Sequence, residues 1–223
     1  MDWKAWIVGT IQSMSGAINP TKIFDDWVKA SAMAMSNACS LHKDKVYEER
    51  ERAYKEIVGQ YKEGQVEAFC EMTGALAMSL EECIEDVLGE IFMKIAWTNK
   101  NVGQFFTPFH LSVLTAKAAM AERLDHWDGS SKIELLEPSS GAGGMIIAAA
   151  KVLAEREVDY QRYMKVVAQD LDWRSVYMCY LQLSLLGIDA VCVQGDSLAG
   201  SYSPTTTDQA HVFRSPRNRG AII

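Results

Sequence analysis

The feature that most constrains the fold is an alternation of short apolar stretches with helical segments beyond residue 130. Residues 132–137, 164–169 and 189–194 are short and apolar, as buried strands are. Residues 145–155 and 173–186 separate them and have the length and composition of helices. Strands and helices that alternate at this spacing predict a parallel sheet with right-handed crossovers. We therefore expect an α/β fold for this part of the chain.

The first hundred residues have a different sequence pattern, because proline is nearly absent and apolar residues recur at the helical period. Pro20 is the one proline there. The change of pattern predicts two domains, a helical domain at residues 1–100 and an α/β domain at residues 101–223. The residues that follow the helical period are Ala53, Tyr54, Ile57, Val58 and Tyr61 in one segment and Ile84, Val87, Leu88, Ile91, Phe92 and Ile95 in another.

Three local signals predict where helices begin and end. Ser79, with Glu82 three positions later, has the pattern of a capping box and predicts the start of the helix that contains Ile84 to Ile95. Asp172 is interpreted as the N-cap of the helix that follows it. Gly187 stands where a left-handed helix C-cap is expected.

Composition and charge exclude several classes of protein. Of the 223 residues, 48% are hydrophobic and 23% are charged, which is typical of a globular chain. The net charge of −7 argues against a free-standing DNA clamp, because phosphate binding depends on lysine and arginine. No apolar run approaches the roughly 18 residues of a membrane span, and the first residues lack a signal-peptide pattern. We expect a cytoplasmic protein that does not enter a membrane.

The five cysteines and four histidines are widely spaced along the chain. An odd number of cysteines without a secretory signal indicates reduced thiols. Because no Cys or His pair has the spacing of zinc ligands, we expect no structural zinc site.

Four short motifs follow one another in the α/β part, next to strand ends or a helix start. They are residues 103–108 (GQFFTP), 137–144 (EPSSGAGG), 170–172 (DLD) and 195–198 (GDSL). Glycines directly after a strand let the backbone approach a ligand closely, and open α/β sheets bind ligands at the carboxyl ends of their strands. These positions predict a ligand site at that edge of the sheet.

The first motif predicts a helix start that suits an anion. Thr107 is a good N-cap residue, and Pro108 suits the first helical position. The free amides of such a helix start favour a carboxylate group.

The glycine-rich motif narrows the choice of ligand. Ile146 stands three positions after Gly143, where a dinucleotide site requires a small residue. A P-loop nucleotidase is excluded because the pattern G-x-x-x-x-G-K-S/T is absent from the sequence. Glu137, at the head of the motif, would repel a pyrophosphate and attract an ammonium group. The motif therefore favours S-adenosylmethionine, and a nicotinamide-dependent oxidoreductase is the weaker alternative.

The four motifs together resemble the modification subunit of type I restriction–modification systems, a family of S-adenosylmethionine-dependent DNA methyltransferases that act on the exocyclic amine of adenine. The similarity runs from about Asp86 to Leu198, and it includes the stretch AQDLDWRSVYMCYLQLSLLGI. The N-terminal part is similar to the family's leading helical domain more loosely. The resemblance implies an N-terminal helical domain followed by a truncated Rossmann-like methyltransferase domain.

For the methionine end of the cofactor, the resemblance implies roles for five residues. Thr107 would hold the carboxylate, and Phe105 would pack near the cofactor. Glu137 would face the ammonium group, while Gly141 and Gly143 let the chain pass beneath it.

For the nucleoside end, the resemblance implies roles for four residues. Asp170 would accept hydrogen bonds from the ribose hydroxyls, and Leu171 would lie against the adenine ring. Asp196 would accept from the adenine amine of the cofactor, with Leu198 on the other face of the ring.

The sequence departs from the family where the target base would bind. The family has Asn-Pro-Pro-Phe or Asn-Pro-Pro-Tyr after a fourth strand, and this pocket holds a flipped adenine. The chain has no Asn-Pro-Pro, and residues 211–219 stand at the corresponding place. Ser215 and Pro216 are the weak catalytic candidates there, without the amide and the aromatic ring. The chain also ends at Ile223, before the remaining strands that we expect of a complete sheet.

Two interpretations follow, and both predict binding of S-adenosylmethionine. The chain is either the cofactor-binding part of an adenine methyltransferase completed elsewhere, or a catalytically degraded relative that acts through a partner or nucleic acid. In the family, a separate specificity subunit recognises the DNA. Arg214, Arg217 and Arg219 form a basic tail that either contacts nucleic acid or solubilises the terminus. The sequence leaves the oligomeric state open.

Overall fold

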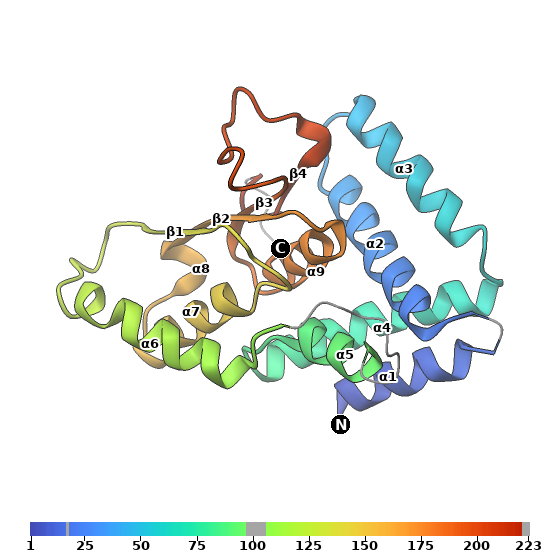
Figure 1. Cartoon of the computed structure of the whole chain (residues 1–223), viewed down its shortest axis with the longest axis horizontal. Coiled ribbons are helices and arrows are strands. Elements are labelled where there is room, and N and C mark those ends of the chain that lie inside the picture. The colour runs from blue at the N-terminus through green and yellow to red at the C-terminus, as the bar shows by residue number, and fades with distance from the viewer. Residues whose placement is uncertain (17, 97–105, 220–223) are drawn as a thin grey trace.

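A computed structural model of the chain describes residues 1–16, 18–96 and 106–219 (Figure 1). Its helices fall into an N-terminal group and a group that accompanies the strands. The first group is α1 (Trp3–Met14), α2 (Pro20–Ala38), α3 (Lys45–Val58), α4 (Glu63–Glu82) and α5 (Val87–Ala96). The second is α6 (Phe109–Asp125), α7 (Gly144–Glu155), α8 (Tyr160–Tyr163) and α9 (Trp173–Leu185).

Among the described residues, four strands form one sheet in the order β1, β2, β3, β4. They are β1 (Ile133–Glu137), β2 (Met164–Asp170), β3 (Asp189–Gln194) and β4 (Val212–Arg214). The first three are parallel and β4 runs antiparallel to β3. The predicted α/β fold and parallel pairing are therefore confirmed, and the three predicted strands differ from the observed ones by at most one residue at either end.

Helix α9 lies between the sheet and the N-terminal helices (Figure 1). Every residue of the segment 175–184 is buried, so the helix has no solvent face. It packs against β2 and β3 on one side and against α2 on the other. As predicted, Asp172 caps its start by accepting from Ser175 N (3.3 Å), and Gly187 has φ +68° just beyond its end.

The two parts of the chain share one continuous buried cluster, which includes Trp27 and Phe92 as well as Ile147 and Tyr180. A bidentate ion pair adds to this contact, because Arg174 Nε and Nη2 donate to the two carboxylate oxygens of Asp25 at 2.6 and 2.7 Å. The predicted boundary at residue 100 lies outside the described residues, and the division into two domains stays a prediction.

The predicted capping box at Ser79 is wrong, because α4 continues through it to Glu82. Ser79 is buried in the same helical stripe as Leu76, so ending the helix there would have cost the packing of that face. Helix α5 begins at Val87 instead, and the residue before it, Asp86, accepts a hydrogen bond from Gly89 N (2.9 Å). Asp86 therefore satisfies one of the free amides in the first turn of α5.

The helices that pack on the sheet cover one of its faces (Figure 1). On the other face, Tyr202 from the segment after β3 packs against Val191, Val193 and Val212. Leu136 of β1 is 60% exposed on the uncovered part. Within the described ranges, no helix is long and apolar enough to cross a membrane.

Strand β4 is held to β3 by more than its ladder. Ser215 Oγ donates to Ile188 O (2.7 Å) and accepts from Ala190 N (3.0 Å), and Ser215 N donates to Ala190 O (2.9 Å). Both Ser215 and Pro216 are buried. This segment lies at the edge of the sheet opposite β1.

The variant Ser215→Ala removes a hydroxyl that pairs one buried carbonyl and one buried amide. Leaving these groups unpaired costs roughly 1–3 kcal/mol, and we expect the free energy of unfolding in urea to fall by about that amount. Ser201→Ala, at an exposed serine, is the control and should change it by less than about 0.5 kcal/mol. Equal losses in the two variants would contradict the bridging role of Ser215.

Candidate cofactor site

The carboxyl ends of β1, β2 and β3 lie at one edge of the sheet because these strands are parallel. The loops that follow them are joined by backbone hydrogen bonds. Ser140 N donates to Gln169 O (3.0 Å), and Gly195 N donates to Asp170 O (2.9 Å). Three of the four sequence motifs therefore meet at this edge, which is where open α/β sheets bind ligands.

Two glycines of the β1 loop have backbone conformations that L-residues rarely adopt. Gly141 has φ +53° and Gly143 has φ +96°. A Cβ at Gly141 would lie 3.0 Å from Phe106 Cδ1, and a Cβ at Gly143 would lie 3.2 Å from Cys179 Sγ. Both positions thus require glycine for conformation and for space.

The Cys179 thiol beneath Gly143 is fully buried and lies 3.9 Å from the sulfur of Cys192. Its hydrogen bond with Cys192, together with burial, raises the pKa of Cys179. The thiol is therefore protonated near neutral pH and fills space beneath the loop instead of acting as a nucleophile.

Asp170 connects the β2 end to the glycine-rich loop. Its Oδ2 accepts from Gly141 N (2.8 Å), and its Oδ1 accepts from Asp172 N (2.9 Å). A carboxylate offers about four lone-pair sites, so each oxygen retains capacity for a further donor. Asp170 is partly exposed and lines a cavity, where a ligand hydroxyl could reach it.

Asp86 belongs to the same site, although it precedes β1 in the chain by more than forty residues. It is 5% exposed, and its Oδ1 accepts from Gln182 Nε2 (2.8 Å) as well as from Gly89 N. A Cβ at Gly144 would lie 3.0 Å from Asp86 Oδ2, so the start of α7 approaches this carboxylate closely. Burial raises the pKa of Asp86 above its ordinary value of 3.8.

A cavity of about 210 Å³ brings these groups together. Ser112 of α6 also lines it, and its hydroxyl is buried without a hydrogen-bond partner among the described residues. A polar ligand in this cavity would satisfy the orphaned hydroxyl of Ser112. The lining residues are Asp86, Phe106, Thr107, Ser112, Ser139, Ser140, Gly141, Ala142, Gly144, Met145 and Asp170.

The predicted cap of the helix beside this cavity is wrong by one position. Pro108, with ψ 131°, occupies the N-cap of α6 and the helix begins at Phe109, so Thr107 is not the cap. Within the described ranges no side chain forms a capping hydrogen bond at the start of α6. The first amides of the helix stay available to an anion.

The structure brings some of the predicted residues into the cavity and places others around it. Thr107, Gly141 and Asp170 line the cavity. Gly143 belongs to the same loop as Gly141 and lies outside the lining, close to Cys179. Glu137 is partly buried outside the lining, where its Oε1 accepts from Ser139 N (3.2 Å).

The remaining predicted residues lie further out. Leu171 is 68% exposed and Leu198 is 97% exposed at the ends of β2 and β3. Asp196 is exposed and accepts from Leu198 N (2.9 Å). Phe105 lies outside the described residues. The buried Ser215 and Pro216, at the far edge of the sheet, are not brought together with the cavity.

Asp86 is the site residue to which the sequence motifs assigned no role. In the sequence, Asp86 is an acidic residue inside the periodic segment that runs from Ile84 to Ile95, directly before Val87. This local pattern cannot predict the contact of Asp86 with Gln182, which lies in α9.

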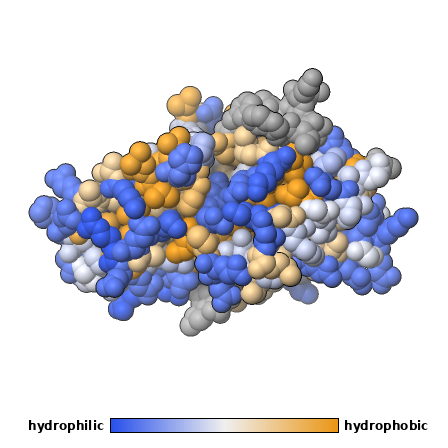
Figure 2. Space-filling model, turned by 90° about the horizontal axis from the view of Figure 1, so that it is seen from below, coloured by the Kyte–Doolittle hydropathy of each residue, from blue (hydrophilic) through white to orange (hydrophobic). Residues whose placement is uncertain are grey.

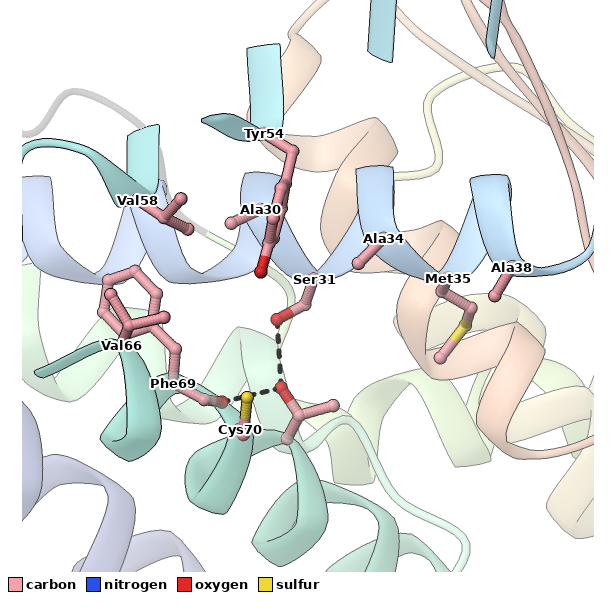
Figure 3. A pocket seen from close by; sticks show the side chains of 11 residues that line it. Ala30, Ser31, Ala34, Met35, Ala38, Tyr54, Val58, Val66, Phe69 and Cys70 are labelled. Atoms are coloured by element: carbon pink, nitrogen blue, oxygen red, sulfur yellow. Dashed lines mark hydrogen bonds between the residues drawn. The ribbon is translucent and has the colours of Figure 1, made fainter. Parts of the chain in front are cut away.

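A larger, more apolar cavity of about 400 Å³ lies between α2, α3 and α4 (Figure 3). Figure 3 shows Ala30, Ser31 and Ala34 along α2, with Tyr54 from α3 and Phe69 from α4 facing them. Its polar groups already bond to one another, since Ser31 Oγ lies 2.9 Å from Thr73 Oγ1. Its described lining contains no charged side chain, and so the strand-end cavity is the better candidate for chemistry.

The face seen from below has hydrophobic side chains gathered chiefly in the left half of the view, with hydrophilic side chains between and around them (Figure 2). Leu111 and Leu114 of α6 are large exposed apolar residues near the cavity. In the described part of the chain, no three His, Cys, Asp or Glu side chains come together to hold a metal ion.

Three parallel strands with a left-handed glycine loop after the first and an acidic residue at the end of the second form an arrangement typical of α/β proteins that bind nucleotide cofactors. The family model for N-6 DNA Methylase matches residues 83–215, more than half of the chain. The chain therefore belongs to the N-6 DNA methylase family. The matched region begins just before Asp86 and includes all of the cavity.

No curated protein matches the chain. Two solved structures are similar at a low level. One is described as a putative class I S-adenosylmethionine-dependent methyltransferase from Listeria monocytogenes, with 11% identity and a TM-score of 0.43 over 88% of this chain and 55% of that one. The other is DszA carbon methyltransferase, with 13% identity and a TM-score of 0.31 over 88% of this chain and 64% of that one. The chain thus spans less than two thirds of either structure.

The variant Gly143→Ala tests the fit of the loop. An L-residue in the left-handed region costs about 1–2 kcal/mol, and the new methyl would press on Cys179 Sγ, so we expect the free energy of unfolding to fall by at least about 1 kcal/mol. Gly200→Ala is the control, because its Cβ would meet nothing within 4 Å. A loss no larger than that of the control would show that the loop adapts to a side chain.

The variant Asp86→Asn tests the buried carboxylate. Because the folded chain binds a proton at Asp86 more tightly than the unfolded chain, the free energy of unfolding should decrease as pH rises from about 3.8 through the raised pKa. Asn keeps the acceptor for Gln182 and Gly89 and removes the titration. Urea unfolding from about pH 4 to about pH 8 should therefore show a smaller decrease in the variant than in the wild type.

Asp128→Asn is the control for that measurement. Asp128 is exposed, and hydrogen bonds from the backbone amides of Ser131 and Ser130 lower its pKa to about 2. The Asp128 carboxylate is ionised in the folded and in the unfolded chain over most of this pH range, so the pH dependence of the free energy of unfolding should not change in the control variant. An unchanged decrease in Asp86→Asn would show that Asp86 does not titrate differently on folding.

Proposed function

We propose that this chain binds S-adenosylmethionine in the strand-end cavity, as the cofactor-binding part of an adenine-specific DNA methyltransferase similar to the modification subunits of type I restriction–modification systems. The observation that carries the proposal is the presence of opposite electrostatics in two adjoining cavities, which share Asp86, Phe106 and Thr107. The buried Asp86 carboxylate lines both cavities and favours a cation, and the uncapped start of α6 lines the second cavity and favours an anion. An amino-acid zwitterion carries both charges.

For the methionine end, the carboxylate would lie at the start of α6 beside Thr107, where the Ser112 hydroxyl is an available donor. The ammonium group would lie against Asp86, since Glu137 is outside the lining. An ammonium group nearby would lower the pKa of Asp86 and keep the carboxylate ionised. We therefore assign to Asp86 the role that the resemblance implied for Glu137.

For the nucleoside end, Asp170 would accept from the ribose hydroxyls through its spare lone pairs. Leu171 and Leu198 present exposed apolar side chains at the adjacent strand ends, which suit the two faces of an adenine ring. Asp196 stands between them in the β3 loop and would accept from the amine of that ring.

When bound, S-adenosylmethionine supplies an activated methyl group, and the chain's own residues orient it. The target adenine would need an amide and an aromatic ring to hold it out of the duplex. Residues 211–219 contribute neither at this edge, because β4 pairs with β3 on the opposite side of the sheet. We propose that methyl transfer occurs in complex with a partner that completes the adenine pocket and recognises the DNA.

The second candidate function is a catalytically degraded module that binds the cofactor and acts through a partner. The position of β4 favours it, because doubly wound sheets place their next strand beside β1 and here that side of β1 has no strand partner among the described residues. Methylation of DNA by the purified chain, alone or with a partner, would exclude this alternative.

Calorimetric titration with S-adenosylmethionine, with NAD as the control ligand, tests the cofactor assignment. We expect saturable binding of the first ligand and none of the second. Asp170→Ala should weaken the affinity at least about tenfold, which corresponds to about 1.4 kcal/mol. Asp159→Ala makes the same change at the start of α8, which directly precedes the amino end of β2 and so lies away from the carboxyl ends of the strands. This variant should leave the affinity unchanged. A folded chain without binding would refute the proposal, and equal affinities in the two variants would remove Asp170 from the ribose role.

A further inference from the structure

Three arginines line a second polar cavity, of about 330 Å³, which shares no described residue with the cofactor cavity. Arg50 comes from α3, Arg214 from β4 and Arg219 from the segment that follows. No carboxylate within the described residues forms an ion pair with any of them. Unpaired arginines in one cavity are uncommon in a chain with a net charge of −7.

Arg50 is buried and held in place by neutral groups. Its Nη1 donates to Ser36 Oγ (2.7 Å), its Nη2 donates to Val212 O (2.7 Å), and its guanidinium lies 4.0 Å from the ring centre of Phe213. A guanidinium has five N–H donors, so these two bonds leave several of them free. Burial, followed by the charge of Arg219, lowers the pKa of Arg50 to about 10, and the group stays cationic at neutral pH.

Arg219 converges on the same hydroxyl. Its Nη2 donates to Ser36 Oγ at 3.4 Å, and its Nη1 donates to Ser40 Oγ at 2.9 Å. Its Nε is buried without a hydrogen-bond partner in the described part of the chain. Two like charges that meet at one serine repel each other in a partly desolvated place, and an anion between them would offset that repulsion.

Arg214 also bonds to neutral acceptors. Its Nη2 donates to Tyr202 Oη (2.9 Å) and its Nη1 donates weakly to Asn218 Oδ1 (3.4 Å). His42 lines the same cavity and adds a further donor. The one carboxylate in the described lining, Asp44, accepts from Tyr47 N (2.9 Å) at the start of α3.

We propose that this cavity, formed by Arg50, Arg214, Arg219 and His42, is a binding site for a phosphate group. The planar guanidinium fork matches the oxygens of a phosphate, and several forks around one cavity hold it by charge-assisted hydrogen bonds. The volume is near the lower end of the roughly 300–1,000 Å³ of small-molecule pockets, which suits a phosphate ester and not a large ligand. The phosphate belongs either to a nucleic-acid backbone or to a small phosphorylated molecule. The proposal does not depend on the cofactor assignment.

Calorimetric titration with inorganic phosphate, against chloride at constant ionic strength, tests the site directly. We expect saturable binding to the full chain and a loss of at least about tenfold in Arg214→Gln and in Arg219→Gln. Arg217→Gln is the matched control, because Arg217 is exposed on the same segment and does not line the cavity. It should bind phosphate as the wild type does. Arg214 is less buried than Arg50, so its variant keeps the test possible if a core variant fails to fold.

A short DNA duplex distinguishes the two sources of phosphate. If the site holds a backbone phosphate, fluorescence anisotropy should show that the chain binds the duplex. The slope of the logarithm of the affinity against the logarithm of the salt concentration should then decrease in magnitude by about 0.9 in each cavity variant, and it should not change in Arg217→Gln. Phosphate binding without such a DNA effect would identify a small phosphorylated ligand. The proposal is overturned if the binding of phosphate and the binding of DNA are both independent of the cavity arginines. It is also overturned if Arg217→Gln weakens binding as much as the cavity variants do.

Discussion

The side-chain amide of Gln182 holds together three parts of the chain that are far apart in sequence. Its Nε2 donates to Ala142 O in the glycine-rich loop and to Asp86 Oδ1, both at 2.8 Å, and its Oε1 accepts from Leu88 N (2.9 Å). Because Gln182 is fully buried in α9, each of these bonds replaces one that water would otherwise make. These hydrogen bonds are all formed when the glycine-rich loop, the start of α5 and helix α9 are arranged as they are here, so Gln182 fixes the three segments relative to one another.

This network joins the start of α5 to the glycine-rich loop beside the strand-end cavity. Asp86, directly before α5, contributes the buried carboxylate of the cavity, and α6 contributes the Ser112 hydroxyl. The sheet by itself supplies the glycine loop and Asp170. The family match, from residue 83 to residue 215, includes Asp86 and α6 as well as the residues of the sheet that line the cavity.

The two polar cavities lie at different borders of the sheet and differ in charge. The cavity at the ends of β1 and β2 contains carboxylates, whereas the cavity beside β4 contains arginines without an ion-pair partner among the described residues. The antiparallel course of β4 produces the second cavity, because it directs Arg214 and Arg219 toward the end of α2 and toward α3. The segment expected to continue the methyltransferase sheet thus closes the opposite border of the fold and faces the N-terminal helices.

The sequence by itself determined the features that depend on neighbouring residues. The apolar stretches predicted three strands, Asp172 and Gly187 marked the ends of α9, and the glycines after β1 predicted the tight loop, since each signal acts within a few residues. The tertiary structure decided what depends on distant ones. Ser79 did not end a helix because its stripe packs in the core, and the contact of Asp86 with Gln182 required α5 to meet α9. Likewise, the convergence of Arg50 and Arg219 depends on β4 joining the β3 edge. Local patterns encode backbone conformation, but contacts between distant segments follow from burying the whole apolar surface at once.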